Sequence, residues 1–351
     1  MLFAPGRKKR PGCLLMLMLL LVVLALVFGL NAMNNGYVTL VKEPVTITGL
    51  DSSFEGFRVL LISDLHGRRF GAEQQRLRDA LRLESYRAVC LTGDMVGPSG
   101  DPEPLLELLR VFPEDVPVYL IAGDEDPQPL SAAADGQVKA PFIRAAEEAG
   151  AIYLDSPQRL TIGKRSLWFM PATLYTTDLV QARFALEQRQ QELTALLQPT
   201  AEDQGQLKVV AYQLAVLDLT EAARKEMHPQ DRYILLSHVP LDADLVSTLH
   251  TGEGAERKAV NFPGTASLIL AGHWNDGQWR LPLLGPVLPP PGARELQTWT
   301  RDGALSGQAS VHGVPMYVSP GLGASIAYPW RPFRLFNRPR ITELTLTAAF
   351  R

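Results

Sequence analysis

Short runs of apolar residues recur along most of this chain, and each run ends at a polar residue. Strands that are buried on both faces give runs of this kind. We therefore predict strands at residues 59–63, 88–93, 118–123, 166–170, 232–237, 267–272, 315–319 and 341–347. Helix-length segments at 72–83, 104–111 and 140–149 follow the first three strands. This alternation predicts an α/β fold.

The first three runs are evenly spaced along the chain. Each is followed by an aspartate, and Asp64, Asp94 and Asp124 are 30 residues apart. One βαβ unit has about this length of 30 residues. Parallel strands of successive units end at the same edge of a sheet, so we expect the three aspartates to lie near one another.

Residues 177–228 follow a different pattern, rich in Gln, Glu, Leu and Ala. Pro199 and Gly205 separate two halves, each with apolar residues at helical spacing. We predict an antiparallel helical hairpin inserted into the fold. A packed insertion without chemistry, a lid over the substrate and a surface for a protein partner are all consistent with this pattern.

The N-terminal part is apolar over a long stretch, because no charged residue occurs at positions 11–41. A helix of about 20 apolar residues crosses a bilayer. We predict a basic tail at 1–12, a transmembrane anchor in the lipid bilayer at 13–33, a linker at 34–47 and one domain at 48–351. Four basic residues at positions 7–10 place the tail in the cytoplasm and the domain outside the cytoplasm, as a single-pass protein of a cell membrane. A cleaved signal peptide is the alternative, although residues 29–33 form a poor cleavage site.

Composition excludes several classes of protein. With 46% hydrophobic residues the chain is not disordered, and with two cysteines, Cys13 and Cys90, it has neither a disulfide framework nor a cysteine-rich zinc site. Without the four basic residues of the tail, 30 Lys and Arg remain against 37 Asp and Glu. Such an acidic body disfavours nucleic acid as a partner.

Asp or His follows five of the predicted strands, which is the central observation on chemistry. Ligands bind beyond the carboxyl ends of strands in open α/β sheets. Two divalent cations about 3.5–4 Å apart need a bridging carboxylate and outer ligands, and such a pair hydrolyses phosphoesters. We read these residues as one metal site; they are Asp64, His66, Asp94, Asp124, His238 and His273.

The motifs around these residues resemble those of the calcineurin-like metallophosphoesterases, and more closely their bacterial membrane-associated branch, sometimes called YkuE-like. The matching motifs are Ser63-Asp64-Leu65-His66, Thr92-Gly93-Asp94, Gly123-Asp124-Glu125-Asp126, Ser237-His238-Val239-Pro240 and Gly272-His273-Trp274-Asn275. The resemblance spans residues 48–347 apart from the helical insertion. It implies a two-sheet αββα sandwich and two metal ions, such as Mn, Fe or Zn.

Carried over position by position, the resemblance implies a role for each residue. Asp94 bridges both ions and is essential for catalysis. The first ion is held by Asp64, His66 and Asn275, and the second by Asp124, His238 and His273. Glu125 stands where the family has a histidine that assists the leaving group, which makes it the second predicted catalytic residue.

Four substitutions relative to the family pattern change the expected chemistry. Asp124 replaces Asn and Asn275 replaces His, so the ligand set is richer in oxygen and favours Mn or Mg over Zn or Fe. Glu125 beside two cations is expected to be ionised and a poor proton donor. Pro320 stands where relatives carry a basic residue, and Arg68 could provide the missing substrate contact.

These observations predict a metal-dependent hydrolase of phosphoesters, with turnover reduced by the substitutions at 124, 125 and 275. The substrate is a phosphodiester or pyrophosphate near the membrane, lipid-linked or derived from the cell envelope. The alternative is a catalytically degenerate scaffold, anchored in the membrane, that acts through its helical insertion on a protein partner.

Overall fold

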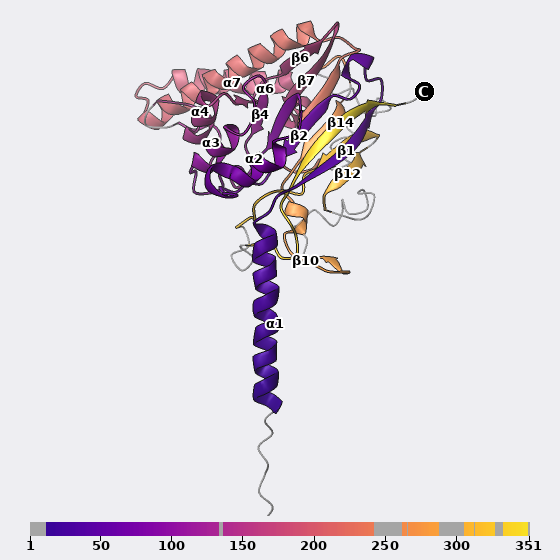
Figure 1. Cartoon of the computed structure of the whole chain (residues 1–351). Helices are drawn as coiled ribbons and strands as arrows, with labels where there is room; N and C mark the ends of the chain where they lie inside the picture. Colours follow the sequence, from indigo (N-terminus) through magenta and orange to yellow (C-terminus); the bar gives the residue numbers. More distant parts are fainter. Residues whose placement is uncertain are drawn as a thin grey trace, which may run out of the picture.

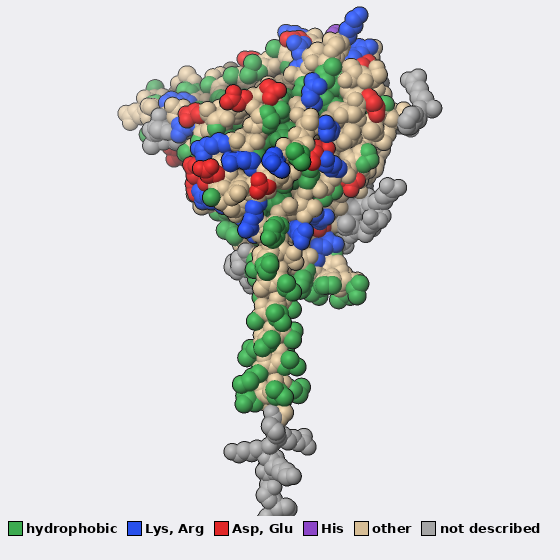
Figure 2. Space-filling view, in the orientation of Figure 1, with side chains coloured by type: hydrophobic (Ala, Val, Ile, Leu, Met, Phe, Trp, Pro, Cys, Tyr) green, Lys and Arg blue, Asp and Glu red, His purple; other side chains and the backbone are tan. Residues whose placement is uncertain are grey.

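The computed structural model describes residues 12–132, 136–241, 262–264, 266–287, 305–311, 313–326 and 333–349. A long helix, α1 (Gly12–Asn35), extends away from a body built of two packed sheets (Figure 1). Apolar side chains cover α1 (Figure 2), and its length and composition suit a membrane span, a property that a signal sequence shares. The predicted basic tail, apart from Gly12, lies outside the described residues.

The first sheet contains the three evenly spaced strands and has the order β1–β14–β2–β3–β4–β5. These strands are β1 (Thr39–Ile47), β14 (Arg340–Ala348), β2 (Arg58–Ile62), β3 (Ala88–Thr92), β4 (Val118–Ile121) and β5 (Ile152–Tyr153). Strands β2 to β5 run parallel, as the βαβ spacing predicts, while β14 is antiparallel to β2.

The second sheet has the order β12–β13–β9–β8–β7–β6. These strands are β12 (Gly307–Val311), β13 (Val314–Val318), β9 (Ala266–Ala271), β8 (Arg232–Leu236), β7 (Arg165–Pro171) and β6 (Gln158–Ile162). The four inner strands are parallel, and the two edge strands are antiparallel to their neighbours.

Three apolar clusters hold the layers together. In β2, Val59 and Leu61 pack toward the second sheet, whereas Leu60 and Ile62 pack among the helices on the other face. Those helices are α2 (Gln75–Leu81), α3 (Glu103–Leu109) and α4 (Pro141–Glu148). The outer face of the second sheet packs against α5 (Ala172–Thr176) and the inserted helices. Burial on both faces explains the unbroken apolar runs, and the predicted α/β fold with two sheets is confirmed.

The segment predicted as a linker, residues 34–47, differs in the structure. Helix α1 continues to Asn35, and β1 pairs in parallel with β14 along its whole length. The prediction missed this strand because Lys42, Glu43 and Pro44 interrupt its apolar pattern. An edge strand tolerates such residues, since one side of its backbone needs no partner strand.

The insertion consists of α6 (Leu179–Thr194) and α7 (Ala201–Glu226), which run antiparallel. Arg183, near the start of α6, contacts Asp218 and Glu221, near the end of α7. Side-chain caps begin both helices, with Asp178 before α6 and the Thr200–Asp203 capping box at α7.

Short elements complete the described body. A 3-10 turn, η3 (Asn275–Gly277), follows β9, and a small hairpin of β10 (Arg280–Leu281) and β11 (Gly285–Pro286) comes next. Two further 3-10 turns are η1 (Ser52–Phe54) and η2 (Ala72–Gln74).

Candidate metal centre

Five of the predicted metal ligands lie just beyond the carboxyl ends of neighbouring parallel strands. Asp64, Asp94 and Asp124 follow β2, β3 and β4 of the first sheet, and His238 and His273 follow β8 and β9 of the second. Backbone hydrogen bonds tie these ends together, from Asp64 N to Gly93 O (3.0 Å) and from Gly272 N to His238 O (2.9 Å). The packed sheets therefore bring both sets of ends to one place, as the sequence predicted.

The backbone at this place is unusual. Five of the site residues have a positive φ between 48° and 73°, a region that residues other than glycine rarely adopt. They are Asp64, His66, Asp94, His273 and Asn275. Backbone strain of this kind persists where the surrounding structure enforces it, and it clusters at functional sites.

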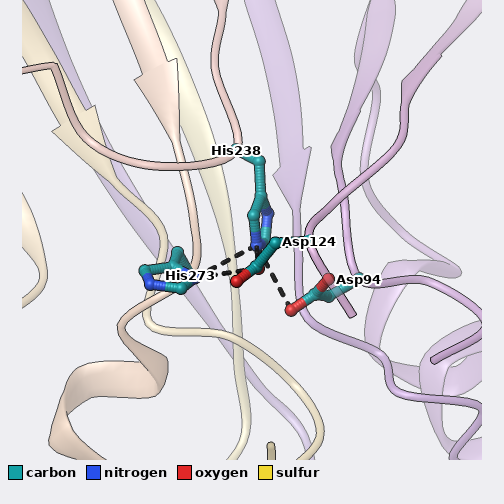
Figure 3. Close-up of side chains that lie close together, drawn as sticks. All are labelled: Asp94, Asp124, His238 and His273. Carbon is teal, nitrogen blue, oxygen red and sulfur yellow. Dashed lines mark hydrogen bonds and ion pairs between the residues drawn. The ribbon is translucent and has the colours of Figure 1, made fainter. Parts of the chain in front are cut away.

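Among the described residues, four ligand-type side chains form one compact group, which we call the four-residue group: Asp94, Asp124, His238 and His273 (Figure 3). Nε2 of His238 lies 2.8 Å from Oδ1 of Asp124 and 3.2 Å from Oδ2 of Asp94. Nδ1 of His273 lies 3.2 Å from the same oxygen of Asp124. One atom from each side chain thus faces a common centre.

The tautomer of His238 is set by the backbone. Its Nδ1 donates to the carbonyl oxygen of Thr92 at 2.8 Å, so Nε2 is the nitrogen that faces the carboxylates. Burial lowers the pKa of His238, but hydrogen bonds to Asp124 and Asp94 outweigh it and raise the pKa to about 11. Nε2 therefore sits where a cation, either a proton or a metal ion, is strongly favoured.

A second group, the three-residue group, consists of Asp64, His66 and Asp94. Asp64 is fully buried and accepts from the backbone N–H of His273 at 3.0 Å and from the Ser63 hydroxyl. Burial raises the pKa of Asp64, a cost that a neighbouring cation offsets. Because Asp94 belongs to both groups, it is placed to bridge two ions.

Glycines make room for this arrangement. A Cβ on Gly123 would lie 2.2 Å from Oδ1 of Asp94, and a Cβ on Gly93 would lie 2.6 Å from Nδ1 of His238. Glycine therefore precedes Asp94 and Asp124 because any larger side chain would collide with the site residues. The donor set of carboxylate oxygens and imidazole nitrogens, with no cysteine, fits divalent metal ions.

Glu125 lies beside the three-residue group. Its Oε2 is 3.1 Å from Nδ1 of His66, and its carboxylate accepts from the hydroxyl of Ser325 and from the backbone N–H of Ile326. Burial raises the pKa of Glu125, but His66 and Ser325 outweigh it and lower the pKa to about 2. The carboxylate is therefore ionised at neutral pH, as expected from the sequence.

Asp126 is a site residue to which the sequence analysis assigned no role. Its carboxylate accepts from the backbone N–H groups of Met95, Val96, Gly97 and Gly123 at 2.9–3.2 Å. It thereby clamps the loop after Asp94 to the loop after β4. An acidic residue at the end of the Gly123-Asp124-Glu125-Asp126 motif was the available signal.

Asn275 lies close to His66, but its side chain is engaged elsewhere. Its Oδ1 accepts from Nη1 of Arg334 at 3.2 Å, while its Nδ2 lies 3.4 Å from Nε2 of His66. A guanidinium is a donor only, so the amide oxygen faces Arg334 and the amide nitrogen faces the three-residue group. An amide nitrogen is not a metal ligand, so this orientation does not supply the ligand atom that the sequence predicted.

Arg334 links this site to helix α1. Its guanidinium is fully buried and also donates to Gly323 O, Pro320 O and Asn337. Its own backbone carbonyl accepts from the side-chain amides of Asn31 and Asn35, in the last turns of α1. Burial lowers the pKa of Arg334 to about 9, which leaves the group charged at neutral pH.

Arg68, the predicted substrate contact, is also engaged by α1. Its Nη2 donates to the backbone oxygen of Asn35 at 2.7 Å, and its guanidinium lies 4.8 Å above the ring of Phe70. The contact of Arg68 with substrate stays a prediction.

An apolar cavity of about 650 Å³ adjoins the four-residue group. Gly123 and His238 line it on the side of the site, while Leu186 of α6 and Tyr212 and Leu217 of α7 line it on the side of the insertion. The inserted hairpin therefore forms one wall of a cavity that reaches the candidate metal centre.

A comparison with protein families agrees with this geometry. A family model described as calcineurin-like phosphoesterase matches residues 57–276, more than half of the chain. The chain belongs to the calcineurin-like phosphoesterase family. It is therefore a metallophosphoesterase, a phosphoric ester hydrolase, and its candidate dinuclear centre is of the type typical of this family.

Two solved structures are similar to most of this phosphoesterase. One is phosphopantetheinyl hydrolase from Mycobacterium tuberculosis, with 14% identity and a TM-score of 0.37, covering 83% of this chain and 96% of that one. The other is a dimetal phosphatase from Danio rerio, with 14% identity and a TM-score of 0.33, covering 76% and 88%. No curated protein sequence matches the chain.

Proposed function

We propose that this phosphoesterase is anchored in a bacterial cell membrane by α1 and hydrolyses a phosphodiester or pyrophosphate at the membrane surface, outside the cytoplasm. The observation that carries the proposal is the contact between the end of α1 and Arg334, since Arg334 also contacts Asn275 beside the candidate metal centre. Because the end of α1 lies beside the candidate metal centre, substrates at the membrane surface, lipid-linked or envelope-derived, would reach the site there. The closer resemblance to the YkuE-like branch is part of the same proposal.

The end of α1 supports an anchor that is retained. Asn31 and Asn35 are 5% and 6% exposed, and Oδ1 of Asn31 accepts from the backbone N–H of Phe336 at 2.8 Å. Removal of α1 would leave the backbone groups of Arg334 and Phe336 without these partners. Residues 13–33 thus form the proposed single span, with the tail at 1–12 in the cytoplasm and the domain at 48–351 outside.

The proposed centre holds two divalent ions, with Asp94 as the bridge. Bound ions of this kind polarise the phosphoryl group and supply hydroxide at neutral pH. The residues of the four-residue group hold one ion, and Asp64 and His66 hold the other. The oxygen-rich ligand set favours Mn or Mg over Zn or Fe.

We assign Glu125 a positioning role. Its carboxylate lies against Nδ1 of His66, so that Nε2 of His66 faces Asp94 at 3.8 Å. Carboxylates commonly orient histidine ligands in this way. Ionised and bound to Ser325, it has no proton to donate to a leaving group, so we expect turnover to be fastest on substrates with good leaving groups.

The degenerate scaffold remains the second candidate, and one observation favours it. Among the exposed side chains of the inserted helices are three large apolar ones, Val180 at 74%, Phe184 at 63% and Leu219 at 57% exposure. A protein partner could cover them. Under this alternative the chain would bind one metal ion or none and would show no turnover.

The test is hydrolysis of bis-p-nitrophenyl phosphate by the full chain in lipid nanodiscs, with Mn, Mg, Zn or no metal. Metal content is measured in the same samples by mass spectrometry. We expect metal-dependent turnover that Asp94→Asn abolishes, whereas the exposed aspartate in Asp115→Asn serves as the matched control and leaves turnover unchanged. Absence of turnover with every metal would contradict the proposal and support the scaffold.

A further inference from the structure

The turn of the β10–β11 hairpin exposes leucines to an unusual extent. We call residues 281–284 the leucine loop; its sequence is Leu281-Pro282-Leu283-Leu284. Leu283 is fully exposed, Leu284 is 78% exposed and Leu281 is 37% exposed. A contiguous exposed apolar patch of this kind marks an interaction site.

The base of the leucine loop is joined to α1 through aromatic rings. The ring of Phe28 in α1 lies 6.4 Å from that of Phe333, and the ring of Phe333 lies 5.3 Å from that of Trp279. Trp279 immediately precedes β10, and its indole N–H donates to the carbonyl oxygen of Phe333 at 2.9 Å. The hairpin therefore begins beside α1.

These contacts place the hairpin partway down the apolar helix. Phe28 precedes Asn35, the last residue of α1, by seven positions, which corresponds to about 10 Å along the helix axis. Figure 1 shows the β10–β11 hairpin projecting from the body on the side from which α1 leaves it, and Figure 2 shows apolar side chains there, next to α1. Tryptophan at such a level is typical of a membrane interface.

The charge distribution also fits a lipid surface. The leucine loop has no charged residue. Arg280, the basic residue next to it, directs Nη1 to Oδ1 of Asp276 at 2.6 Å, and Asp276 is buried in the body. The charge at the base of the hairpin is thus paired, and the apolar tip is left free to enter an apolar phase.

From these observations we infer that the leucine loop is a second membrane contact, inserted into the bilayer beside α1. This inference rests on the proposed membrane span of α1. With two contacts, the phosphoesterase domain cannot rotate freely on a single helix, and the loop that carries Arg334 is held at the bilayer surface. The substrate class that fits such a fixed site is a phosphoester whose apolar part stays in the membrane.

The test measures whether lipid reaches the leucine loop. Full chains carrying Cys13→Ala and Leu283→Cys are labelled with bimane and placed in nanodiscs of phosphatidylcholine and phosphatidylglycerol, with or without lipids that bear a nitroxide close to the headgroup. Cys90 is buried and burial raises the pKa of its thiol, so it does not compete for the label. We expect nitroxide lipids to quench the emission at position 283.

Two further labels separate the possible failures. Leu24→Cys, in α1, reports on the span, and Leu197→Cys, 99% exposed in the turn between α6 and α7, is the matched control that lipid should not reach. Quenching at 24 without quenching at 283 would overturn the inference and leave the span intact. Absence of quenching at 24 would overturn the proposed span and the inference with it.

The remaining outcomes are equally decisive. Equal quenching at 283 and 197 would overturn the inference, because lipid contact would then be unspecific. Disulfide crosslinking between two unlabelled Leu283→Cys chains, without lipid quenching, would assign the leucine loop to a second copy of the chain instead. Each labelled variant must hydrolyse bis-p-nitrophenyl phosphate at the rate of the parent chain, which shows that the fold is intact.

Discussion

The two ligand groups that share Asp94 are built differently. The four-residue group draws its side chains from both sheets, and its ring nitrogens and carboxylate oxygens lie 2.8–3.2 Å apart. The three-residue group has Asp64 and His66 from one loop, and the amide oxygen of its neighbour Asn275 faces Arg334. We therefore expect the four-residue group to hold its metal ion more tightly.

The two groups also differ in what orients the histidine of each. In the four-residue group the backbone carbonyl of Thr92 orients His238, whereas in the three-residue group the side chain of Glu125 lies against His66. A backbone partner cannot be removed by substitution, but a side-chain partner can. The three-residue group is thus the more sensitive to changes around it.

The largest effect is expected from a pair of histidine substitutions. His238→Ala should remove the ion of the four-residue group and lower turnover by more than about 100-fold, since changes in residues that merely orient ligands cost about 10–100-fold. His66→Ala should remove one ion and leave the other bound. Metal content measured by mass spectrometry checks this, and loss of both ions in His66→Ala would contradict the comparison.

Arg334→Met should destabilise the fold. The buried guanidinium donates to four backbone or side-chain groups besides Asn275, and leaving buried acceptors unpaired costs about 1–3 kcal/mol each, so we expect a loss of about 3 kcal/mol or more in the free energy of unfolding. Thermal unfolding in nanodiscs measures the effect. Arg338→Met, at an exposed arginine, is the control, and an equal loss there would argue against a special role for Arg334.

Glu125→Gln should weaken metal binding at the three-residue group by about 10-fold, because it removes the charge beside Nδ1 of His66. The four-residue group should keep its affinity. Titration of Mn followed by electron paramagnetic resonance distinguishes the two, with Glu148→Gln on the exposed end of α4 as the control. An equal loss of Mn affinity at both groups would show that Glu125 acts on the whole centre.

The smallest effect is expected from Asp124→Asn. Its side chain is 58% exposed, and turnover should fall by about threefold or less, because amide oxygens also bind hard cations. Steady-state hydrolysis with Mn measures it. A loss of the bound ion would instead show that the carboxylate charge of Asp124 holds the four-residue group together.

The local pattern of apolar and polar residues was sufficient to predict most strands of the two sheets and the positions of the candidate ligands. The runs that became β2, β3, β4, β8 and β9 are apolar because both faces of each sheet are buried, and the polar residue that ends each run stands at the carboxyl edge. The candidate ligand residues could therefore be named before their contacts were known. Strand β1 escaped prediction, since Pro44 and its charged neighbours are tolerated at an edge but break the pattern of a strand.

The apolar helix, the strands and the ligand types follow from the order of residues, because hydrophobic periodicity and chemical type are local properties. Tertiary structure decided which way those groups face. Asn275 matches a ligand position in sequence, yet its side-chain oxygen accepts a hydrogen bond from Arg334, 59 residues further on. The backbone of Arg334 also contacts the end of α1. Contacts between distant segments depend on how the sheets pack, and no local pattern in the chain contains that information.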